Sequence, residues 1–253
     1  MLLDDLLGHY RELLYLPDET AVLAALATVA AQDIPGPPVW TMLVGPPSSG
    51  KTEIIDSLRL VDRAVSLSAL TRASLLSGRA GGAGGLLLTH FSNGSGLLLV
   101  KDFTTILSEA AGTRTEIIAV LRETYDGHIT RAVGSRDNLL TWQGKITFLG
   151  AVTEEIEQHR SVISLMGDRF LYVPMPSLQQ ARTHIAKEAI RQAARQGAIR
   201  ECLAKAVRDF FTHQPPAAVT TPDESDVEWL AAAADLRRPS AVTGPPRPKK
   251  PRN

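Results

Sequence analysis

Residues 45–52, GPPSSGKT, place two glycines, a lysine and a threonine at the spacing G-x-x-x-x-G-K-T. In a glycine-bearing turn of this kind, successive backbone N–H groups converge on one point, where they can surround a phosphate group. The apolar run Val39–Val44 before the turn predicts a strand. Residues Lys51–Leu60 after it predict a helix, whose positive end would also attract phosphate. The alternative is a Gly/Pro turn before a helix that happens to contain Lys-Thr.

The loop therefore predicts a binding site for the triphosphate of a nucleotide, with ATP as the expected ligand. Lys51 would reach the β- and γ-phosphates, and the Thr52 hydroxyl would coordinate Mg²⁺. The residues expected to bind the nucleotide are Gly45, Pro46, Pro47, Ser48, Ser49, Gly50, Lys51, Thr52 and Glu53.

Short apolar runs alternate with helical patterns between residues 35 and 176. This alternation predicts a parallel sheet with right-handed crossovers, so the expected fold class is α/β, a P-loop type of parallel sheet flanked by helices. Further strands are predicted at 64–67, 97–100, 145–151 and 170–173, helices at 71–77, 113–125 and 154–165, and a β-hairpin at 128–142.

Three segments flank this predicted core of residues 35–176. Residues 1–34 predict two helices, which form a lead-in packed on the core or, alternatively, a partner-binding arm. Residues 177–213 predict a short helical lid whose two helices join near Gly197. Residues 214–253 shift to proline, alanine and charge, and their basic, proline-rich end predicts a disordered tail.

The apolar run LLLV at 97–100 leads into Lys101 and Asp102. Beside the phosphate loop, Asp102 would hold Mg²⁺ through water and would support catalysis; alternatively, it caps the next helix. Many ATPases place a glutamate directly after such an aspartate to position the attacking water, but the next residue here is Phe103. In a second interpretation the register shifts by one, so that Lys101 takes the metal position and Asp102 positions the water.

Because Phe103 cannot polarise water, the general base must come from elsewhere, or hydrolysis is slow or absent. The acidic residues that follow are the candidates, and the sequence does not rank them. They are Glu109, Glu116, Glu123 and Asp126.

The order of these motifs resembles the AAA+ superfamily of P-loop ATPases over residues 35–200. The segment LRETYDGHITRAVGS at 121–135 is similar to the helix and hairpin of bacterial enhancer-binding proteins and replicative MCM helicases. The segment ITFLGAVT at 146–153 is similar to the strand that follows in those families. With GPPSSGKTEI and VKDFTTIL, the chain resembles uncharacterised AAA+ ATPases of bacteria, phages and mobile elements more than any named motor.

The resemblance implies roles for two further residues. Thr153 stands where those families often carry asparagine, so it would sense the γ-phosphate; alternatively, or in addition, it is a helix N-cap. In GDRF at 167–170, Arg169 corresponds to an arginine that reaches the nucleotide of a neighbouring subunit. The alternative is a surface arginine paired with Asp168 or Glu157.

The resemblance also implies an oligomeric ATPase, commonly a closed homo-oligomeric ring, that uses ATP to remodel a nucleic-acid or protein partner. Phe103 and the short lid favour a different function, a nucleotide-gated switch or assembly factor with little hydrolysis. A third possibility is a P-loop kinase for a small molecule, against which the hairpin and GDRF argue.

Composition bears on the partners and the compartment. The formal net charge is zero, but Arg131 and Arg136 in the hairpin, together with the basic tail, could bind DNA phosphates. The apolar run Ala21–Ala31 is far shorter than the roughly 20 residues of a membrane helix, so no membrane partner is expected. The single cysteine, Cys202, cannot form an intramolecular disulfide, which suits the cytoplasm, and its helical neighbours predict that it is buried.

Overall fold

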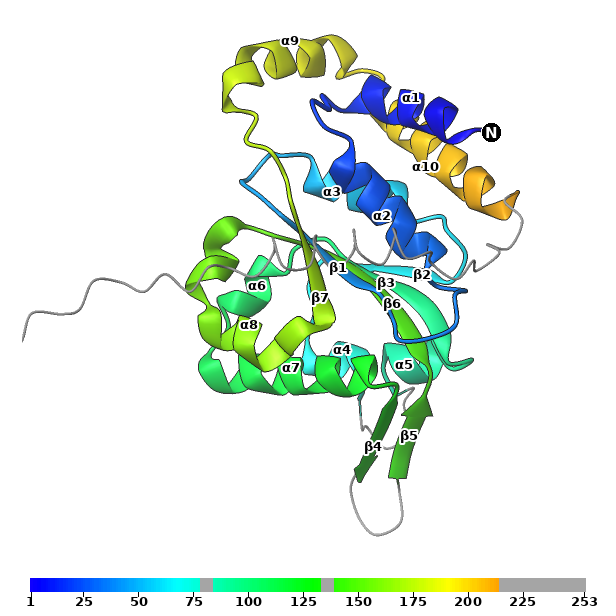
Figure 1. Ribbon diagram of the computed structural model, residues 1–253, viewed down its shortest axis with the longest axis vertical. Helices are drawn as coiled ribbons and strands as arrows, with labels where there is room; N and C mark the ends of the chain where they lie inside the picture. The colour runs from blue at the N-terminus through cyan, green and yellow to red at the C-terminus, as the bar shows by residue number, and fades with distance from the viewer. Residues whose placement is uncertain (78–83, 133–138, 214–253) are drawn as a thin grey trace, which may run out of the picture. The chain divides into compact units, whose positions relative to one another are not determined.

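Apolar runs form five parallel strands in the computed structural model, in the order β2-β3-β6-β1-β7 (Figure 1). The structure describes residues 1–77, 84–132 and 139–213, which lie within one unit, Met1–Ala217. The predicted α/β class, a parallel sheet flanked by helices, is confirmed. The strands of this sheet are β1 (Trp40–Val44), β2 (Ala64–Leu67), β3 (Ser95–Val100), β6 (Lys145–Val152) and β7 (Phe170–Pro174).

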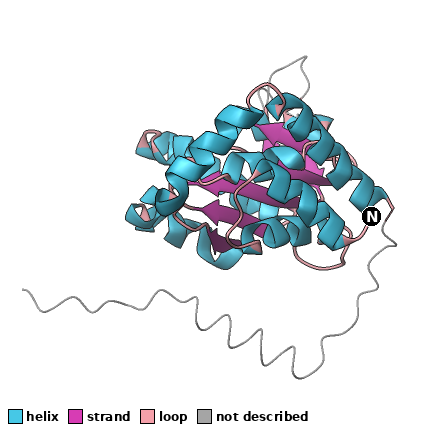
Figure 2. Cartoon of the chain, turned by 90° about the horizontal axis from the view of Figure 1, so that it is seen from above, coloured by secondary structure: helices cyan, strands magenta, loops and turns pink. Residues whose placement is uncertain are grey.

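Helices cover both faces of the sheet, which is why its strands are apolar on both sides. Alternate residues of β3 separate into two cores: Leu97 and Leu99 face one layer, and Leu98 and Val100 face the other. Figure 2 shows helices lying over the strands. The first layer contains α1 (Leu3–Leu13), α2 (Thr20–Ala30), α3 (Lys51–Ser57) and α10 (Gln196–Thr212). The second contains α4 (Arg72–Leu75), α5 (Leu86–Thr89), α6 (Thr104–Leu107), α7 (Ala111–Tyr125) and α8 (Arg160–Met166).

The strands end together at one edge, called here the carboxyl edge. Val44 at the end of β1 is opposite Val152 of β6 and Pro174 of β7. At the other end, called the amino edge, Trp40 is opposite Phe148 and Phe170. The loops that follow β1, β3 and β6 therefore leave the sheet at the carboxyl edge, where ligands bind in open α/β sheets.

The remaining elements project from this core or border it. The predicted hairpin is present as β4 (His128–Ala132) and β5 (Leu139–Gln143), which pair antiparallel. After β7 the chain forms a short 3₁₀ turn, Gln179–Ala181, and then α9 (Arg182–Gln192) before α10. The predicted tail at 214–253 lies outside the described residues.

Several local predictions need correction. The helix predicted at 154–165 is a 3₁₀ helix, Glu154–Gln158, followed by α8. The lid helices join at residues 193–195, close to the predicted Gly197, which itself lies in the first turn of α10. Four-residue helices such as α5 and α6 are too short to show a helical period, so the sequence did not predict them.

Cys202 was predicted to be buried, but it is exposed. Its neighbour Leu203 is buried, and so is Val207 one turn later. Successive helix residues are rotated by about 100°, so a cysteine one residue before a buried leucine can face solvent. The apolar composition around Cys202 was a poor guide to its own orientation.

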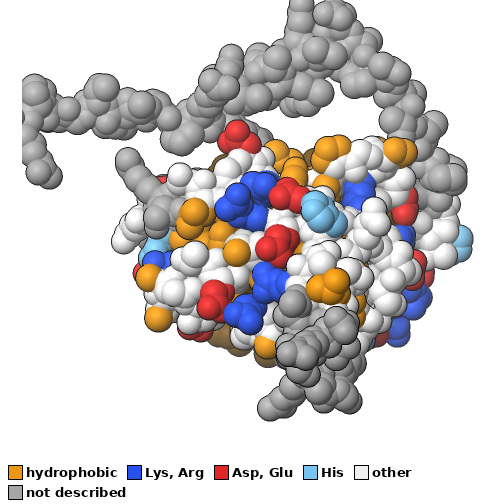
Figure 3. All heavy atoms as spheres, turned by 90° about the horizontal axis from the view of Figure 1, so that it is seen from below, with side chains coloured by type: hydrophobic (Ala, Val, Ile, Leu, Met, Phe, Trp, Pro, Cys, Tyr) orange, Lys and Arg blue, Asp and Glu red, His pale blue; other side chains and the backbone are white. Residues whose placement is uncertain are grey.

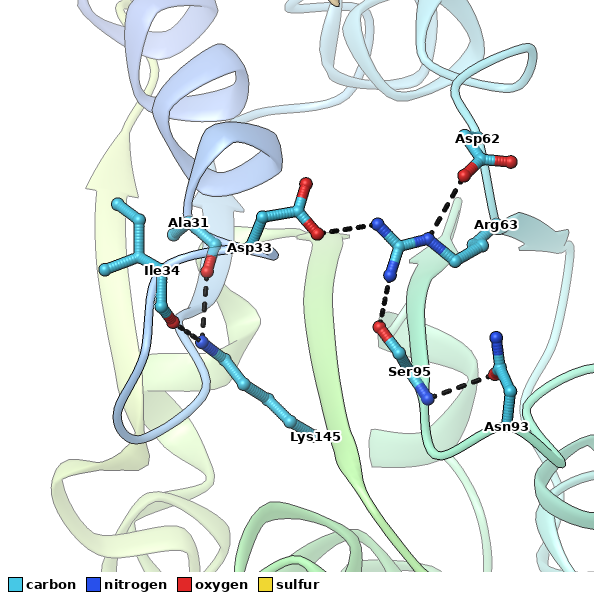
Figure 4. A network of polar contacts seen from close by, with 8 residues as sticks. All are labelled: Ala31, Asp33, Ile34, Asp62, Arg63, Asn93, Ser95 and Lys145. Atoms are coloured by element: carbon cyan, nitrogen blue, oxygen red, sulfur yellow. Dashed lines mark hydrogen bonds and ion pairs between the residues drawn. The ribbon is translucent and has the colours of Figure 1, made fainter. Parts of the chain in front are cut away.

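Polar contacts join the end of α2 to three strand starts at the amino edge (Figure 4). The Lys145 ammonium at the start of β6 donates to the carbonyls of Ala31, at 3.1 Å, and Ile34. Arg63, just before β2, donates to Asp33 at 2.7 Å and to Ser95 at the start of β3. The ammonium thereby binds the carbonyl of Ala31, the C-cap of α2, and that of Ile34 in the loop after it.

We expect Lys145→Ala to lower the free energy of unfolding by about 1–3 kcal/mol, because part-buried carbonyls would lose a charged donor. Urea unfolding measures this. The control is Lys205→Ala, whose side chain is 56% exposed beside Glu201 and should change stability by less than about 0.5 kcal/mol. Equal losses in both variants would contradict the capping role.

Within the described ranges of the chain, no helix combines the length and the apolar character that spanning a bilayer requires.

Candidate functional site

The loop 45–50 leaves the carboxyl edge at the end of β1, between β6 and β7. The geometry of the loop requires glycine at positions 45 and 50. A Cβ on Gly45 would lie 2.7 Å from the Met175 Cβ, which is too close for a larger residue. Gly50, directly before α3, has φ +89°, in the left-handed region that glycine adopts without strain. The loop is thus shaped by close packing on one side and by a left-handed turn on the other.

The Lys51 side chain turns back into this loop. Its ammonium donates to the carbonyls of Gly45 and Pro46, both at 2.7 Å, and to the Ser49 hydroxyl at 3.2 Å. The residue is only 9% exposed. Burial lowers the pKa of Lys51, while the charge of the nearby Asp102 acts to raise it. The structure therefore holds a positive charge inside the loop and within electrostatic reach of Asp102.

A cavity of about 500 Å³ opens beside the loop. Three segments line it: Arg11–Tyr15 at the end of α1, Ser48–Glu53 of the loop and α3, and residues of α9 and early α10. The centroids of the Tyr15 and His184 rings lie 5.8 Å apart, with the ring planes tilted by 56°. This volume lies within the usual range for small-molecule sites. The sequence did not indicate that α1 and α9 would form walls of the site.

Asp102 follows β3 at the same edge, with β6 between β3 and the strand β1 that leads into the loop 45–50. Its carboxylate accepts the N–H of Thr104, the first residue of α6, at 2.8 Å, although the N-cap position itself is Phe103. The side chain remains exposed. This hydrogen bond uses one oxygen of the carboxylate and leaves lone pairs that can accept further hydrogen bonds or coordinate a cation.

Thr153, at the end of β6, contacts the same turn. Its N–H donates to the Thr104 hydroxyl at 3.2 Å, and the two hydroxyl oxygens are 3.5 Å apart. Thr153 occupies the N-cap position of the following 3₁₀ helix, but its side chain makes no capping hydrogen bond. Thr104, which the sequence did not single out, therefore connects the residues after β3 with the end of β6.

Phe103 belongs to the core and not to the site. It is 1% exposed, and its ring contacts those of Phe148 and Phe170 edge to face at 6.3 and 6.2 Å. A glutamate at this position would bury its carboxylate among aromatic rings at a cost of several kcal/mol. The missing glutamate thus has a structural explanation.

Lys101 forms an ion pair with Asp56 of α3, with 2.6 Å between Nζ and Oδ1. An ammonium has no lone pair with which to ligate a metal, and the ion pair with Asp56 favours this charged form. This contact disfavours the shifted register, in which Lys101 takes the metal position, and it favours Asp102 as the metal-facing acid.

The candidate bases differ in where they lie along the segment after β3. The end of α7 lies at the amino edge, because the Gly127 carbonyl accepts the N–H of Gly144, directly before β6. Glu123 and Asp126 therefore lie far from the loop of their own chain. Helix α7 is about 22 Å long at 1.5 Å per residue. Glu109, before α7, and Glu116, in its first half, are the candidates on the near side.

Arg169 lies directly before β7, at the amino edge. The strand separates it from the carboxyl edge by about 13 Å at 3.3 Å per residue. Its predicted alternative partners were Asp168 or Glu157, but its ion-pair partner is Asp126, at 3.0 Å. Arg169 therefore cannot reach the loop 45–50 of its own chain from this position.

Glu53, the last residue of the predicted binding segment, forms an ion pair with Arg200 of α10. Its carboxylate accepts two hydrogen bonds from Arg200, one of them at 2.8 Å. Nearby, Arg59 pairs with Glu201 at 2.6 Å. Two ion pairs thus connect α10 with α3 and with the turn that follows it. The sequence did not indicate Arg200 as part of this arrangement.

The face shown in Figure 3 has basic and acidic side chains interspersed, without a patch of one sign. Arg131, a predicted DNA contact, pairs with Glu123 of α7 at 3.2 Å. Arg136 and the basic tail lie outside the described residues. DNA binding by these residues therefore stays a prediction.

Comparison with protein-family models and with curated proteins gives no match to this chain.

Proposed function

We propose that this chain is an AAA+-like P-loop ATPase that binds ATP with Mg²⁺ at residues 45–53 and uses it to remodel a nucleic-acid or protein partner. The observation that carries the proposal is the Lys51 ammonium inside the loop, 2.7 Å from the Gly45 and Pro46 carbonyls and beside the 500 Å³ cavity. A phosphate oxygen is an acceptor of the same kind as those carbonyls and carries charge, so it would replace them.

The cavity would hold the base and ribose, with its walls in α1 and α9. The residues near the loop also fit Mg²⁺, which takes oxygen ligands and is often held by one or two carboxylates together with substrate phosphates. The Thr52 hydroxyl and the Asp102 carboxylate are such ligands. Bound metal would neutralise charge on the phosphates.

Two further residues would act on the phosphates. Thr153, oriented through Thr104, would sense the γ-phosphate, and Arg169 would act on the nucleotide of a second copy.

The metal assignment is tested with Asp102→Asn. We expect the variant to bind ATP but to lose Mg²⁺-dependent turnover by about 10²–10³-fold, because asparagine has no charge with which to hold the metal. Calorimetry measures binding, and phosphate release measures turnover. The matched control is Asp62→Asn at the amino edge, where the side chain is 88% exposed. Unchanged turnover in Asp102→Asn would show that the metal role is wrong.

Phe103 favours a second function, a nucleotide-gated switch or assembly factor. Its buried ring leaves the position after Asp102 without a group that can position water. Under this proposal the unaltered oligomer binds ATP tightly yet releases phosphate no faster than ATP does in buffer. Turnover measured with and without DNA, at a known oligomeric state, separates the two functions and tests DNA as the partner.

A further inference from the structure

The Arg169 side chain is held on three sides. Nη2 contacts both carboxylate oxygens of Asp126, at 3.0 and 3.3 Å, and Nη1 donates to the Met166 carbonyl at 3.2 Å. The guanidinium carbon lies 5.4 Å from the centre of the Tyr125 ring. The side chain is 23% exposed. A long, flexible side chain is thus restricted to one pose at the molecular surface.

Stability alone is a weak reason for this arrangement. The Asp126 side chain is 48% exposed, and an ion pair between such exposed groups contributes only about 0–1 kcal/mol. Restricting an arginine also costs side-chain entropy, which is lost in advance of any binding event. The arrangement is well suited to an arginine that must meet a ligand in a defined position, because a preorganised guanidinium loses less entropy on binding.

We infer that Asp126 is a positioning residue, which holds Arg169 in the pose that reaches the nucleotide of a second copy; the inference rests on the proposed function. Each terminal nitrogen of a guanidinium carries two N–H groups. Nη1 uses one of them for the Met166 carbonyl, and the other can donate to phosphate. Asp126 therefore orients the group without consuming all of its donors.

The same contact links Arg169 to the hairpin. Asp126 follows the last residue of α7, and the next residue, Gly127, turns the chain into β4 with φ +83°. The Gly127 carbonyl also accepts the Gly144 N–H at 2.9 Å, which closes the base of the hairpin. Asp126 therefore lies at the junction between α7 and the hairpin while it contacts Arg169.

The test compares two mixtures of full-length subunits. In the reference mixture, Lys51→Ala subunits supply an intact Arg169 to the intact loops of Arg169→Ala subunits. In the second mixture, the Lys51→Ala subunits also carry Asp126→Asn. We expect the second mixture to have a kcat about 10–100-fold lower at an unchanged KM for ATP, since the affected arginine does not belong to the subunit that binds ATP. Asp126→Glu in place of Asp126→Asn should restore part of the rate.

The control is Asp209→Asn, the same change at another arginine pair, where Asp209 is 50% exposed beside Arg208. It should leave the mixture as active as the reference, and urea unfolding should show that both variants are folded. Equal kcat with and without Asp126→Asn overturns the positioning role alone. An inactive reference mixture overturns the trans-acting arginine and, with it, this inference. A kcat that falls together with a loss of folded protein, and is not restored by Asp126→Glu, also counts against positioning.

Discussion

Lys51→Ala should weaken ATP binding by a factor of about 30 to several thousand, equivalent to 2–5 kcal/mol, because truncating one member of a desolvated charge pair costs this much. The side chain is 9% exposed, so water screens its charge weakly. It is also the loop's own cation, bonded to the Gly45 and Pro46 carbonyls at 2.7 Å. Titration calorimetry with ATP and Mg²⁺ measures the loss.

The truncation also removes a donor from those two carbonyls, so the loop itself can rearrange. Circular dichroism and urea unfolding of Lys51→Ala therefore accompany the titration, and Lys205→Ala serves as an exposed lysine control. If a folded Lys51→Ala variant binds ATP as tightly as the unaltered chain, the loop is a structural turn and the assignment of the phosphate site fails.

Arg169→Ala should retain ATP binding but lose hydrolysis by about 10³-fold or more, the effect of removing an arginine finger in other phosphoryl-transfer systems. ATP binding should be retained because Arg169 lies at the amino edge, whereas the loop 45–50 that would bind ATP leaves the carboxyl edge. Hydrolysis should be lost because Arg169 would act on the nucleotide of a second copy. A site completed by a second copy also requires activity per subunit to rise with protein concentration. Phosphate release over a dilution series, beside sedimentation of the same samples, measures both.

Mixing Arg169→Ala with Lys51→Ala subunits should restore part of the activity, because one supplies the loop and the other the arginine. Arg208→Ala is the control, an arginine 45% exposed on α10 that pairs with its neighbour Asp209. A specific activity that does not change on dilution to the monomer would rule out the trans-acting role and favour the switch or the small-molecule kinase.

The sequence predicted the fold where the signal is local. The run LLLV at 97–100 predicted a strand, and the structure places it in β3 with cores on both faces. The hairpin was equally predictable, because two extended runs flank a turn-rich segment. The candidate phosphate loop could be singled out because the chemistry proposed for it depends on residues that are adjacent in the chain, and its role stays a prediction.

The rest of the candidate site depends on contacts between distant residues. Asp126 and Arg169 are 43 positions apart, and Glu53 and Arg200 are 147 positions apart. No residue pattern within either segment indicates the other. The role of Phe103 was hidden for a related reason, since its partners Phe148 and Phe170 are on other strands. The sequence shows that residue 103 is apolar, but only the folded structure shows that its ring lies in the core and away from the candidate site.

Helix α9 borders the cavity, yet none of its described side chains is buried, and Ile190 is 76% exposed. A helix of 11 residues is marginal in water without tertiary packing. Segments with little buried apolar surface open locally at a small free-energy cost, long before the rest of the domain unfolds. A ligand in the cavity must therefore supply the free energy that orders this wall, so the apparent affinity is lower than the contacts alone would give. Hydrogen exchange in α9 would accordingly report occupancy of the cavity, while exchange in β3 would not.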